Sequence, residues 1–427
     1  MSIRSRKLPV AMRTVGIIGL GYVGLPLAVA FAEEGCEVIA VDSDARKIES
    51  IASGTSYIED ISSERLRDAL DHISASTRYA KLAEAEAVLI CVPTPLTANR
   101  EPDLTPLIDS ARELGEVLEA GQLVVLESTT YPGTTRERVA PLLEESGLAA
   151  GRDFNLAFSP ERVDPGRTDF TLRTTPKVVG GLTDTCTERA VELYGLVCDE
   201  IVRVSSPEAA ELTKLLENIF RSVNIALVNE LAMLTDRMGI DIWEVVDAAA
   251  TKPYGFMRFE PGPGMGGHCL PVDPFYLSWR AREFDMSTEF IELAGQVNAQ
   301  MPYHCVAKVQ RALNDAGRAV RGSRIAVLGV SYKPGVGDTR ESPALKIIEL
   351  LLDLGAQLSY HDPHVPRLKD FELESTPLES AVADADLALI VTAHPEVDHE
   401  LVAKRARIVV DLRGVTRSSS VGNVVRL

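Results

Sequence analysis

The stretch TVGIIGLGYVGLPLAVAFAEEGCEVIAVDSD, from Thr14 to Asp44, decides the fold of the N-terminal part of this chain. The apolar run Val15–Ile18 predicts a short buried strand. Leu25–Glu34 has the periodicity of a helix that Gly35 ends, and Val38–Val41 predicts the next strand. Strand, glycine turn, helix and strand in this order begin a doubly wound α/β unit.

The turn in this stretch carries Gly19, Gly21 and Gly24 in the pattern GxGxxG, and Asp42 ends the second strand. The glycines allow a tight turn and a close approach of the backbone to a pyrophosphate, which then faces the N-terminus of the helix. Asp42 can accept hydrogen bonds from both ribose hydroxyls and would repel a 2′-phosphate, so the pattern favours NAD over NADP. We expect the cofactor site to include Tyr22, Val23, Arg46, Thr94 and Thr129 as well.

The alternation of strands and helices continues along the chain. Buried strands that end in polar loops are predicted within Ala87–Pro95, Leu123–Thr134 and Phe154–Gly166. A long helix is predicted from Ser206 to Met238, with an N-cap serine and Gly239 as its stop, and its apolar character predicts a dimer face.

A second unit of the same kind begins near Ser323 and repeats strand, glycine loop, helix and strand as far as Asp362. Further strands are predicted within Asp384–His394 and Ala406–Gly414. The expected fold class is therefore α/β, with two Rossmann-like doubly wound domains joined by a helical middle region. The expected domains are 1–205, 206–305 and 306–427.

The composition excludes some classes of function. The 427 residues carry a formal net charge of −18, which argues against nucleic acid and anionic membranes as partners. The six cysteines are scattered without a CxxC pair, as in reduced cytosolic proteins. Basic residues before Val15 resemble the start of a signal peptide, but the glycines and Pro26 that follow make a poor apolar helix. We therefore expect a cytoplasmic protein.

One loop does not fit a purely structural role. PGPGMGGHCLPVDPFYL, from Pro261 to Leu277, places Cys269 after four glycines and Asp273 four residues further on. Such a loop lets the backbone and a ligand come close to a thiol. We expect Cys269 to meet a substrate, whereas Cys91, in an apolar strand, is expected to be a buried core thiol.

The chain resembles the UDP-sugar dehydrogenases of the UDP-glucose/GDP-mannose dehydrogenase family. The resemblance is carried by GLGYVGLPLA, ESTTYPGT, FSPERVDPG, ELTKLLENIFRSVNIALVNELA and PGPGMGGHCLPVDPFYL, and a sixth stretch, SYKPGVGDTRESPALKI, supports it. These enzymes use NAD to oxidise the C6 alcohol of a nucleotide sugar to a carboxylate. With His268 and Val272, the cysteine loop resembles that of the branch that acts on UDP-N-acetylhexosamines. The resemblance implies UDP-GlcNAc as the expected substrate and a surface polysaccharide as the destination of the product.

The chemistry of that reaction explains the cysteine. Oxidation of an alcohol to an acid removes four electrons, and each NAD takes two. A thiol that adds to the intermediate aldehyde gives a thiohemiacetal, which loses a second hydride to become a thioester that water hydrolyses. Lys214 and Asn218 lie four residues apart, so they share one face of the long helix, and both can stabilise a developing oxyanion.

The resemblance implies roles for further residues. Glu161 is implied in proton transfer and hydrolysis, and Asp273 with Thr129 in positioning or activating water; which carboxylate acts as base in each step stays open. The expected contacts to the UDP-sugar come from Glu161, Arg162, Lys214, Asn218, Arg258, Gly266, Lys333 and Arg340. Among these, Arg258 is expected to reach the neighbouring subunit's substrate or to be a solvated surface residue.

Other interpretations of the sequence stay open. UDP-ManNAc, UDP-GalNAc or UDP-glucose could replace UDP-GlcNAc. A two-electron hydroxyacid-type dehydrogenase shares the first domain but needs no cysteine on this loop, and a non-catalytic binding protein could drop Cys269, Lys214 or Asp273. The histidines His361, His364, His394 and His399 lack a recognisable ligand pattern, so we expect loop histidines and no metal. We expect a homodimer or a higher homo-oligomer.

Overall fold

The computed structural model describes residues 12–97, 101–163, 169–267, 270–419 and 421–427. The chain forms two compact units. The first contains the described residues up to Glu217 together with Phe275–Met286, and the second contains Asn218–Pro274 and Ser287–Leu427. The helices α7 (Pro207–Met238) and α9 (Asp273–Ala281) each run from one unit into the other. The three domains expected from the sequence stay a prediction.

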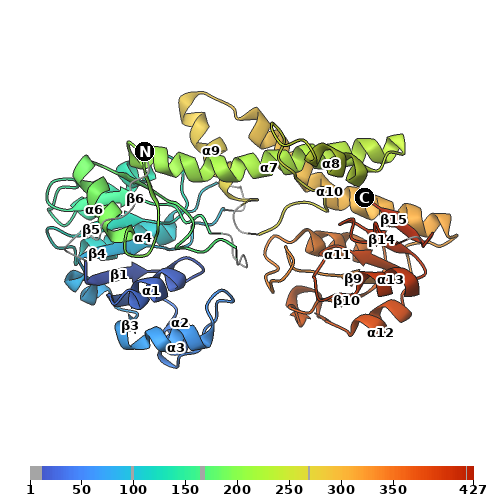
Figure 1. The fold of residues 1–427 in the computed structure, drawn as a ribbon, viewed down its shortest axis with the longest axis horizontal. Coiled ribbons are helices and arrows are strands. Elements are labelled where there is room, and N and C mark those ends of the chain that lie inside the picture. The colour runs from blue at the N-terminus through green and yellow to red at the C-terminus, as the bar shows by residue number, and fades with distance from the viewer. Residues whose placement is uncertain (1–11, 98–100, 164–168, 268–269, 420) are drawn as a thin grey trace. The chain divides into compact units, whose positions relative to one another are not determined.

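Eight strands of the described chain form the sheet of the first unit, in the order β3-β2-β1-β4-β5-β6-β7-β8 (Figure 1). All neighbours are parallel except β6 and β7, and the first six strands have the order of a dinucleotide-binding fold. The strands are β1 (Thr14–Ile18), β2 (Glu37–Val41), β3 (Ile73–Ser76), β4 (Ala87–Ile90), β5 (Leu123–Leu126), β6 (Asn155–Phe158), β7 (Lys177–Gly181) and β8 (Ile201–Arg203). The helices are α1 (Gly24–Glu33), α2 (Ala45–Ala52), α3 (Ser63–Ala69), α4 (Thr105–Gly115), α5 (Ala140–Glu144) and α6 (Asp184–Tyr194).

Close packing requires glycine at two positions of the turn after β1. A Cβ atom on Gly24, the first residue of α1, would lie 1.9 Å from the carbonyl oxygen of Gly19. Gly19 itself has a φ of 90°, which only glycine adopts readily. Alternate residues of β1, Val15 and Ile17, are fully buried in one cluster with side chains of α1 and α6, which explains the short apolar run in the sequence.

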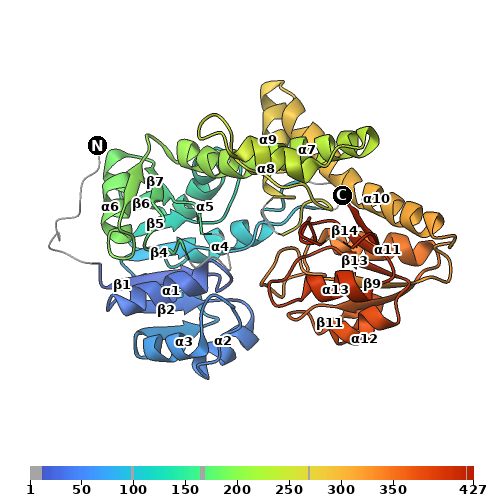
Figure 2. The same cartoon turned by 45° about the vertical axis from the view of Figure 1, so that its right-hand side comes forward.

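The second unit has a five-stranded parallel sheet in the order β10-β9-β13-β14-β15, whose strands are labelled between Figure 1 and Figure 2. The strands are β9 (Arg324–Leu328), β10 (Gln357–His361), β13 (Leu387–Ile390), β14 (Val409–Asp411) and β15 (Val424–Arg426), with β11 (Arg367–Leu368) and β12 (Leu373–Glu374) in a separate antiparallel pair. The helices are α8 (Ile242–Ala250), α10 (Glu289–Asp315), α11 (Pro343–Asp353), α12 (Leu378–Ala383) and α13 (His399–Arg405).

Helices cover both faces of this second sheet. Ile325 and Val327 of β9 are buried with side chains of α10 and α11, whereas the alternate residues Ala326 and Leu328 are buried with α12 and α13. Strands buried on both faces read as continuous apolar runs, as these do. The expected architecture, two doubly wound α/β units and a helical middle region, is confirmed. Within the described residues, none of the helices has the length and apolar character to cross a membrane.

Candidate active site

The first part of the site is the glycine turn and the acid that follows β2. The backbone N–H of Leu20 donates to Oδ2 of Asp42 over 2.7 Å, and Lys47 Nζ lies 2.8 Å from the same oxygen. The N–H of Asp44 donates to Oδ1, and the contacts between described residues leave one lone pair on that oxygen. A Cβ on Gly21 would meet no atom within 4 Å, so there is room beside the turn for a phosphate.

The other predicted cofactor residues of this turn have different surroundings. Val23 is the N-cap of α1, and Tyr22 is partly exposed beside it. Arg46 lies on the exposed side of α2, where its guanidinium pairs with Asp44 over 2.8 Å. In this structure Arg46 therefore contacts a neighbouring side chain rather than Asp42.

The loops after β4 and β5 come together, as their positions in the sheet predict. Thr94 follows β4, and its hydroxyl donates to the carbonyl oxygen of Thr129, which follows β5, over 2.7 Å. Tyr276 of α9 donates to the carbonyl oxygens of Thr94 and Pro95. These contacts place the two predicted threonines at the carboxyl ends of the strands, where ligands bind in such sheets.

Glu161, in the loop after β6, has a precise set of partners. Its Oε1 accepts the backbone N–H groups of Arg162 and Val163 over 2.6 and 2.5 Å. Its Oε2 lies 3.5 Å from Nζ of Lys177, the first residue of β7. Burial opposes ionisation, but the charge of Lys177, these N–H groups and Lys214 outweigh it and lower the pKa of Glu161. The carboxylate is therefore ionised at neutral pH.

Lys214 and Arg162 connect this loop to α7. Lys214 Nζ donates to the carbonyl oxygen of Glu161 over 2.6 Å, so these two predicted residues lie together. The guanidinium of Arg162 donates to the carbonyl oxygen of Pro176 and to Glu217, each over 2.6 Å. In this structure Arg162 holds the loop against α7 and contacts Glu217 of that helix.

The second unit contains a matching pair further along α7. The amide nitrogen of Asn218 donates to Oδ2 of Asp273, and both side chains are buried. Arg221, one turn further along the helix, donates to the amide oxygen of Asn218. Asp273 is the first residue of α9 and stands four residues after Cys269 in the sequence. Cys269 and His268 lie outside the described residues.

The glycine-rich loop packs against the loop that carries Lys333 and Arg340. The N–H of Gly267 donates to the carbonyl oxygen of Arg340 over 3.1 Å. A Cβ on Gly266 would lie 2.7 Å from Tyr332 Cβ, so only glycine permits this approach. The predicted residues Gly266, Lys333 and Arg340 thus belong to two adjoining loops, in which Arg340 pairs with Asp338 over 2.7 Å. Arg258 pairs elsewhere in this unit, 2.8 Å from Asp247 and 3.0 Å from Glu260.

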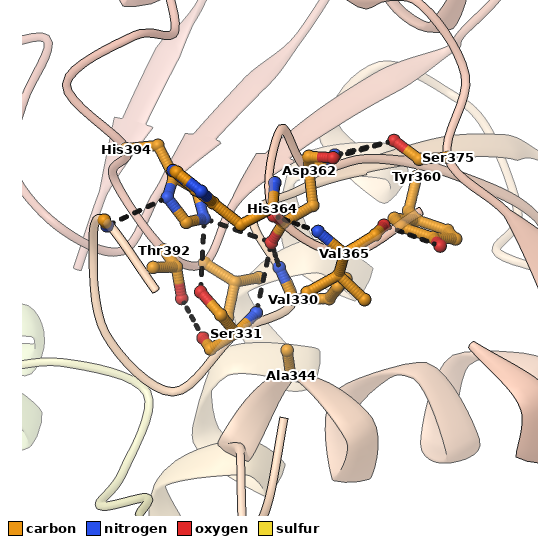
Figure 3. Close-up of polar contacts among 12 residues, drawn as sticks. Val330, Ser331, Ala344, Tyr360, Asp362, His364, Val365, Ser375, Thr392 and His394 are labelled. Atoms are coloured by element: carbon orange, nitrogen blue, oxygen red, sulfur yellow. Dashed lines mark hydrogen bonds and ion pairs between the residues drawn. The ribbon is translucent and has the colours of Figure 1, made fainter. Parts of the chain in front are cut away.

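Asp362 directly follows β10, as Asp42 directly follows β2 in the first unit, but its acceptor positions are filled (Figure 3). Oδ2 accepts the N–H groups of Val330 and Ser331 and lies 3.0 Å from Nε2 of His394. Oδ1 accepts the N–H groups of His364 and Val365. Asp362 therefore holds its own loops in place and has no lone pair left for a ribose.

The histidines of this unit correct one expectation. His361 is the last residue of β10 and His399 is the first of α13, so these two are not loop histidines, whereas His364 and the fully buried His394 lie in loops as expected. His364, His394 and Glu396 each offer an atom within 4.8 Å of the others. The N–H of Gly335 donates to Nδ1 of His394 over 3.2 Å, so Nε2 carries the proton that faces Asp362. Hydrogen bonds thus occupy both nitrogens, and the absence of a metal stays a prediction.

Sequence reasoning missed several buried polar residues of the first unit. Lys177 contacts both Glu127 and Glu161, and Lys177 and Glu127 are almost fully buried. Glu211 of α7 accepts hydrogen bonds from the turn Gly133–Thr135. The available signal was weak. Lys177 is the first residue of the buried strand KVVGG, and Glu127 directly follows the buried strand LVVL. A charged residue at either position stands where an apolar side chain usually continues the core.

The strand order, the glycine turn and Asp42 define a dinucleotide-binding unit, joined by a lysine–asparagine helix to a second doubly wound unit. Residues 13–197 match the NAD binding domain of the UDP-glucose/GDP-mannose dehydrogenase family. Residues 208–300 match the central domain of that family and residues 326–418 its UDP binding domain. The chain belongs to the UDP-glucose/GDP-mannose dehydrogenase family, and its cofactor is NAD.

Individual relatives support this assignment over nearly the whole chain. A UDP-N-acetyl-D-mannosamine dehydrogenase of Pyrococcus horikoshii is 37% identical over 421 residues, which cover 96% of this chain and 98% of that protein. A UDP-N-acetyl-D-glucosamine 6-dehydrogenase of Pseudomonas aeruginosa is 35% identical over 82% of this chain and 83% of its own length. The solved structure of a UDP-D-ManNAc dehydrogenase from P. horikoshii superposes with a TM-score of 0.89 at 35% identity, covering 97% of this chain and 98% of that one.

Proposed function

We propose that this nucleotide-sugar dehydrogenase oxidises the C6 hydroxyl of a UDP-N-acetylhexosamine, with UDP-GlcNAc as the first candidate, to the uronate through a thioester on Cys269. The pair Asn218–Asp273 carries the proposal. This hydrogen bond connects two predicted parts of the site. Asn218 belongs to α7, the helix predicted to stabilise an oxyanion, and Asp273 is the carboxylate that follows the cysteine loop.

NAD supplies the chemistry of hydride acceptance when it is bound. The residues that would hold it are Gly19, Gly21 and Gly24 beside the pyrophosphate and Asp42 beside the adenosine ribose. Lys214 and Asn218 stabilise the alkoxide that forms as the C6 hydroxyl loses its proton. Loss of a first hydride from the alkoxide carbon gives the aldehyde, the Cys269 thiolate adds to that carbon, and loss of a second hydride leaves the thioester; the two hydrides would be accepted by two NAD, bound in turn.

Hydrolysis of the thioester needs a base for water. Glu161 is ionised and Asp273 is oriented by the amide of Asn218, so both are able to accept a proton. Water adds to the thioester carbonyl, the C–S bond breaks, and the sulfur leaves as the thiolate that began the cycle. Lys333 and Arg340 are proposed to neutralise the diphosphate of UDP.

The remaining cysteines favour Cys269 as the nucleophile. Those that the structure describes, Cys36, Cys91, Cys186, Cys198 and Cys305, are all buried. Burial raises the pKa of Cys198 and of Cys305 to about 12, and it raises the pKa of Cys91 well above its ordinary value. A buried thiol that stays protonated is a poor nucleophile, so none of these three suits a covalent step.

UDP-ManNAc is kept as the second candidate substrate because the relative from P. horikoshii is named for it. Identities of 37% and 35% to the two differently named relatives do not separate the sugars. A cytoplasmic location and delivery of the uronate to a surface polysaccharide are part of the same proposal.

The decisive measurement is the amount of NADH formed for each sugar consumed. UDP-GlcNAc, UDP-ManNAc, UDP-GalNAc and UDP-glucose are compared, and UDP-GlcNAc is expected to give the highest kcat/KM with two NADH per sugar. The C269S variant is expected to lose kcat by on the order of a thousandfold or more, whereas C198S, which removes a buried thiol, keeps its activity. One NADH per sugar, independent of Cys269, would indicate a two-electron dehydrogenase instead; no turnover of any sugar would favour a binding protein.

A further inference from the structure

We propose that Lys177 is a positioning residue for this reaction, which holds the carboxylate of Glu161 ionised and correctly oriented. The inference rests on the proposed function only in that Glu161 acts there as a catalytic carboxylate. Lys177 itself is not proposed to contact the substrate.

Lys177 is a buried lysine between two carboxylates. It is 2% exposed, and its Nζ lies 2.8 Å from Oε2 of Glu127 and 3.5 Å from Oε2 of Glu161. Tyr194 of α6 donates its hydroxyl to the other oxygen of Glu127, and Nζ lies 5.0 Å from the centroid of the Tyr194 ring. The ammonium is therefore contacted by Glu127 from the segment after β5, by Glu161 from the loop after β6 and by Tyr194 from α6.

Lys177 faces two carboxylates, Glu127 and Glu161, although one would be enough to neutralise its charge. Burial opposes the charge of Lys177, but Glu127 and Glu161 outweigh it and raise the pKa of the ammonium above its ordinary value. Glu127 alone would neutralise a buried lysine, and a purely apolar core at this place would be at least as stable. The second contact, to Glu161, is the feature that a stabilising ion pair does not require.

Lys177 and the backbone together fix both oxygens of Glu161. The N–H groups of Arg162 and Val163 hold Oε1, and Lys177 faces Oε2. The carboxylate plane is thereby set, and lone pairs of Oε2 stay available for a proton in transit. An oriented base needs this kind of support from residues that do not themselves react.

The charged and titratable groups around Glu161 come from several elements. Lys177 and Lys214 favour its ionised form, and Glu127, across the lysine, opposes it. Cys91 and Cys198 lie near enough to interact with it electrostatically, and both remain protonated thiols. Removal of Lys177 leaves only Lys214 as a cation close to Glu161 among these groups, so its affinity for a proton must rise.

The chain offers a matched control in the second unit. Lys308 of α10 is 3% exposed, and its Nζ lies 2.5 Å from Oδ1 of Asp236 on α7. It is a buried lysine paired with a carboxylate, as Lys177 is, but Asp236 is not a predicted site residue. A substitution at Lys308 therefore reports the general cost of breaking a buried ion pair.

The experiment compares K177Q, E127Q/K177Q, K177R and K308Q. The double variant replaces the buried pair by two amides of similar shape, so it is expected to fold where K177Q does not. The acid limb of kcat against pH is expected to move upward by roughly one pH unit or more in E127Q/K177Q, and to stay in place in K177R and K308Q. An unchanged acid limb in E127Q/K177Q would overturn the proposal.

A second readout does not need turnover. The change in Tm caused by E161Q is followed against pH, with and without E127Q/K177Q. The pH at which this change sets in is expected to be higher by roughly one unit or more when Lys177 is removed. The same onset in both backgrounds contradicts the role of Lys177, even if no nucleotide sugar is oxidised. If only the proposed function is wrong, removal of Lys177 still raises the pH at which the effect of E161Q on Tm sets in, but no NADH is formed.

Discussion

Asp42 and Asp362 occupy the same place in the two units, at the end of the second strand of each sheet. Each accepts an N–H group from the loop after the first strand, Leu20 in one case and Val330 in the other. His394 and three further N–H groups fill the remaining acceptor positions of Asp362, whereas Asp42 keeps one lone pair. At the scale of the residue, Asp42 is the one of these two described aspartates that can still accept a hydrogen bond from a ribose hydroxyl.

Replacing Asp42 tests this difference. The D42A variant is expected to raise the KM for NAD by roughly ten- to a hundredfold, because a hydrogen bond to a charged acceptor contributes about 1.5–3 kcal/mol. The ratio of kcat/KM for NAD to that for NADP is expected to fall, since the repulsion of a 2′-phosphate is removed. Initial rates with both cofactors measure it. D362A is the control: it should lower Tm, and an altered cofactor ratio in that variant would contradict the assignment.

At the scale of the element, Glu211 shows how α7 is joined to the loop that carries Thr129. Its carboxylate is fully buried and accepts the N–H of Gly133 over 2.6 Å and both the N–H and the hydroxyl of Thr135 over 2.9 and 2.7 Å. No ion pair with Glu211 is present in the described part of the chain. Burial is the largest influence on this group and raises its pKa to about 7, although these hydrogen bonds favour the carboxylate.

This raised pKa makes stability depend on pH. The folded chain holds the proton of Glu211 more tightly than the unfolded chain, so the stability it adds is complete below pH 4.5 and is lost as pH rises to about 7. The advantage of the native chain over E211Q in free energy of unfolding is expected to shrink by about 3 kcal/mol across this interval.

Urea unfolding at several pH values measures this difference. Trp243 and Trp279 are the two tryptophans of the chain and belong to different units, so W243F makes fluorescence report the first unit. The comparison is made in that background. An advantage that grows with pH would show that the hydrogen bonds of Gly133 and Thr135 outweigh burial.

At the scale of the whole molecule, α7 leaves an apolar stripe exposed. The stripe consists of Leu216, Phe220, Leu227, Leu231, Leu234 and Met238, whose spacings of three, four or seven residues place them on one face. Leu216 is 62% exposed and Met238 60%. Contiguous exposed apolar side chains usually mark a contact with another chain, so we propose that a second copy covers the stripe.

Sedimentation velocity at micromolar concentration tests this assembly. The native chain is expected to sediment as a dimer or larger species, and L227E, which puts a charge in the middle of the stripe, as a monomer. L352E is the matched control, because Leu352 of α11 is also exposed, at 40%, but lies outside the stripe. A native chain that is monomeric, or an equal effect of both variants, would remove the stripe as the interface.

Local patterns in the sequence predicted the elements well. Apolar runs, the glycine turn and the caps predicted β1, α1, β2 and α7 to within a residue or two, because each depends on neighbours a few positions away. The family resemblance singled out Lys214, Glu161, Asn218 and Asp273, and the structure brings these together in two pairs.

The partners of those residues depended on the tertiary structure. Lys177 meets Glu127, 50 residues away in the sequence, only because β5 and β7 belong to one sheet, and no spacing rule links them. Asp42 and Asp362 have the same local pattern, and a histidine 32 residues further along decides that the second is saturated. Local sequence determines secondary structure because its forces act between near neighbours, whereas hydrogen bonds and ion pairs in a core form only when folding brings distant segments within a few ångströms.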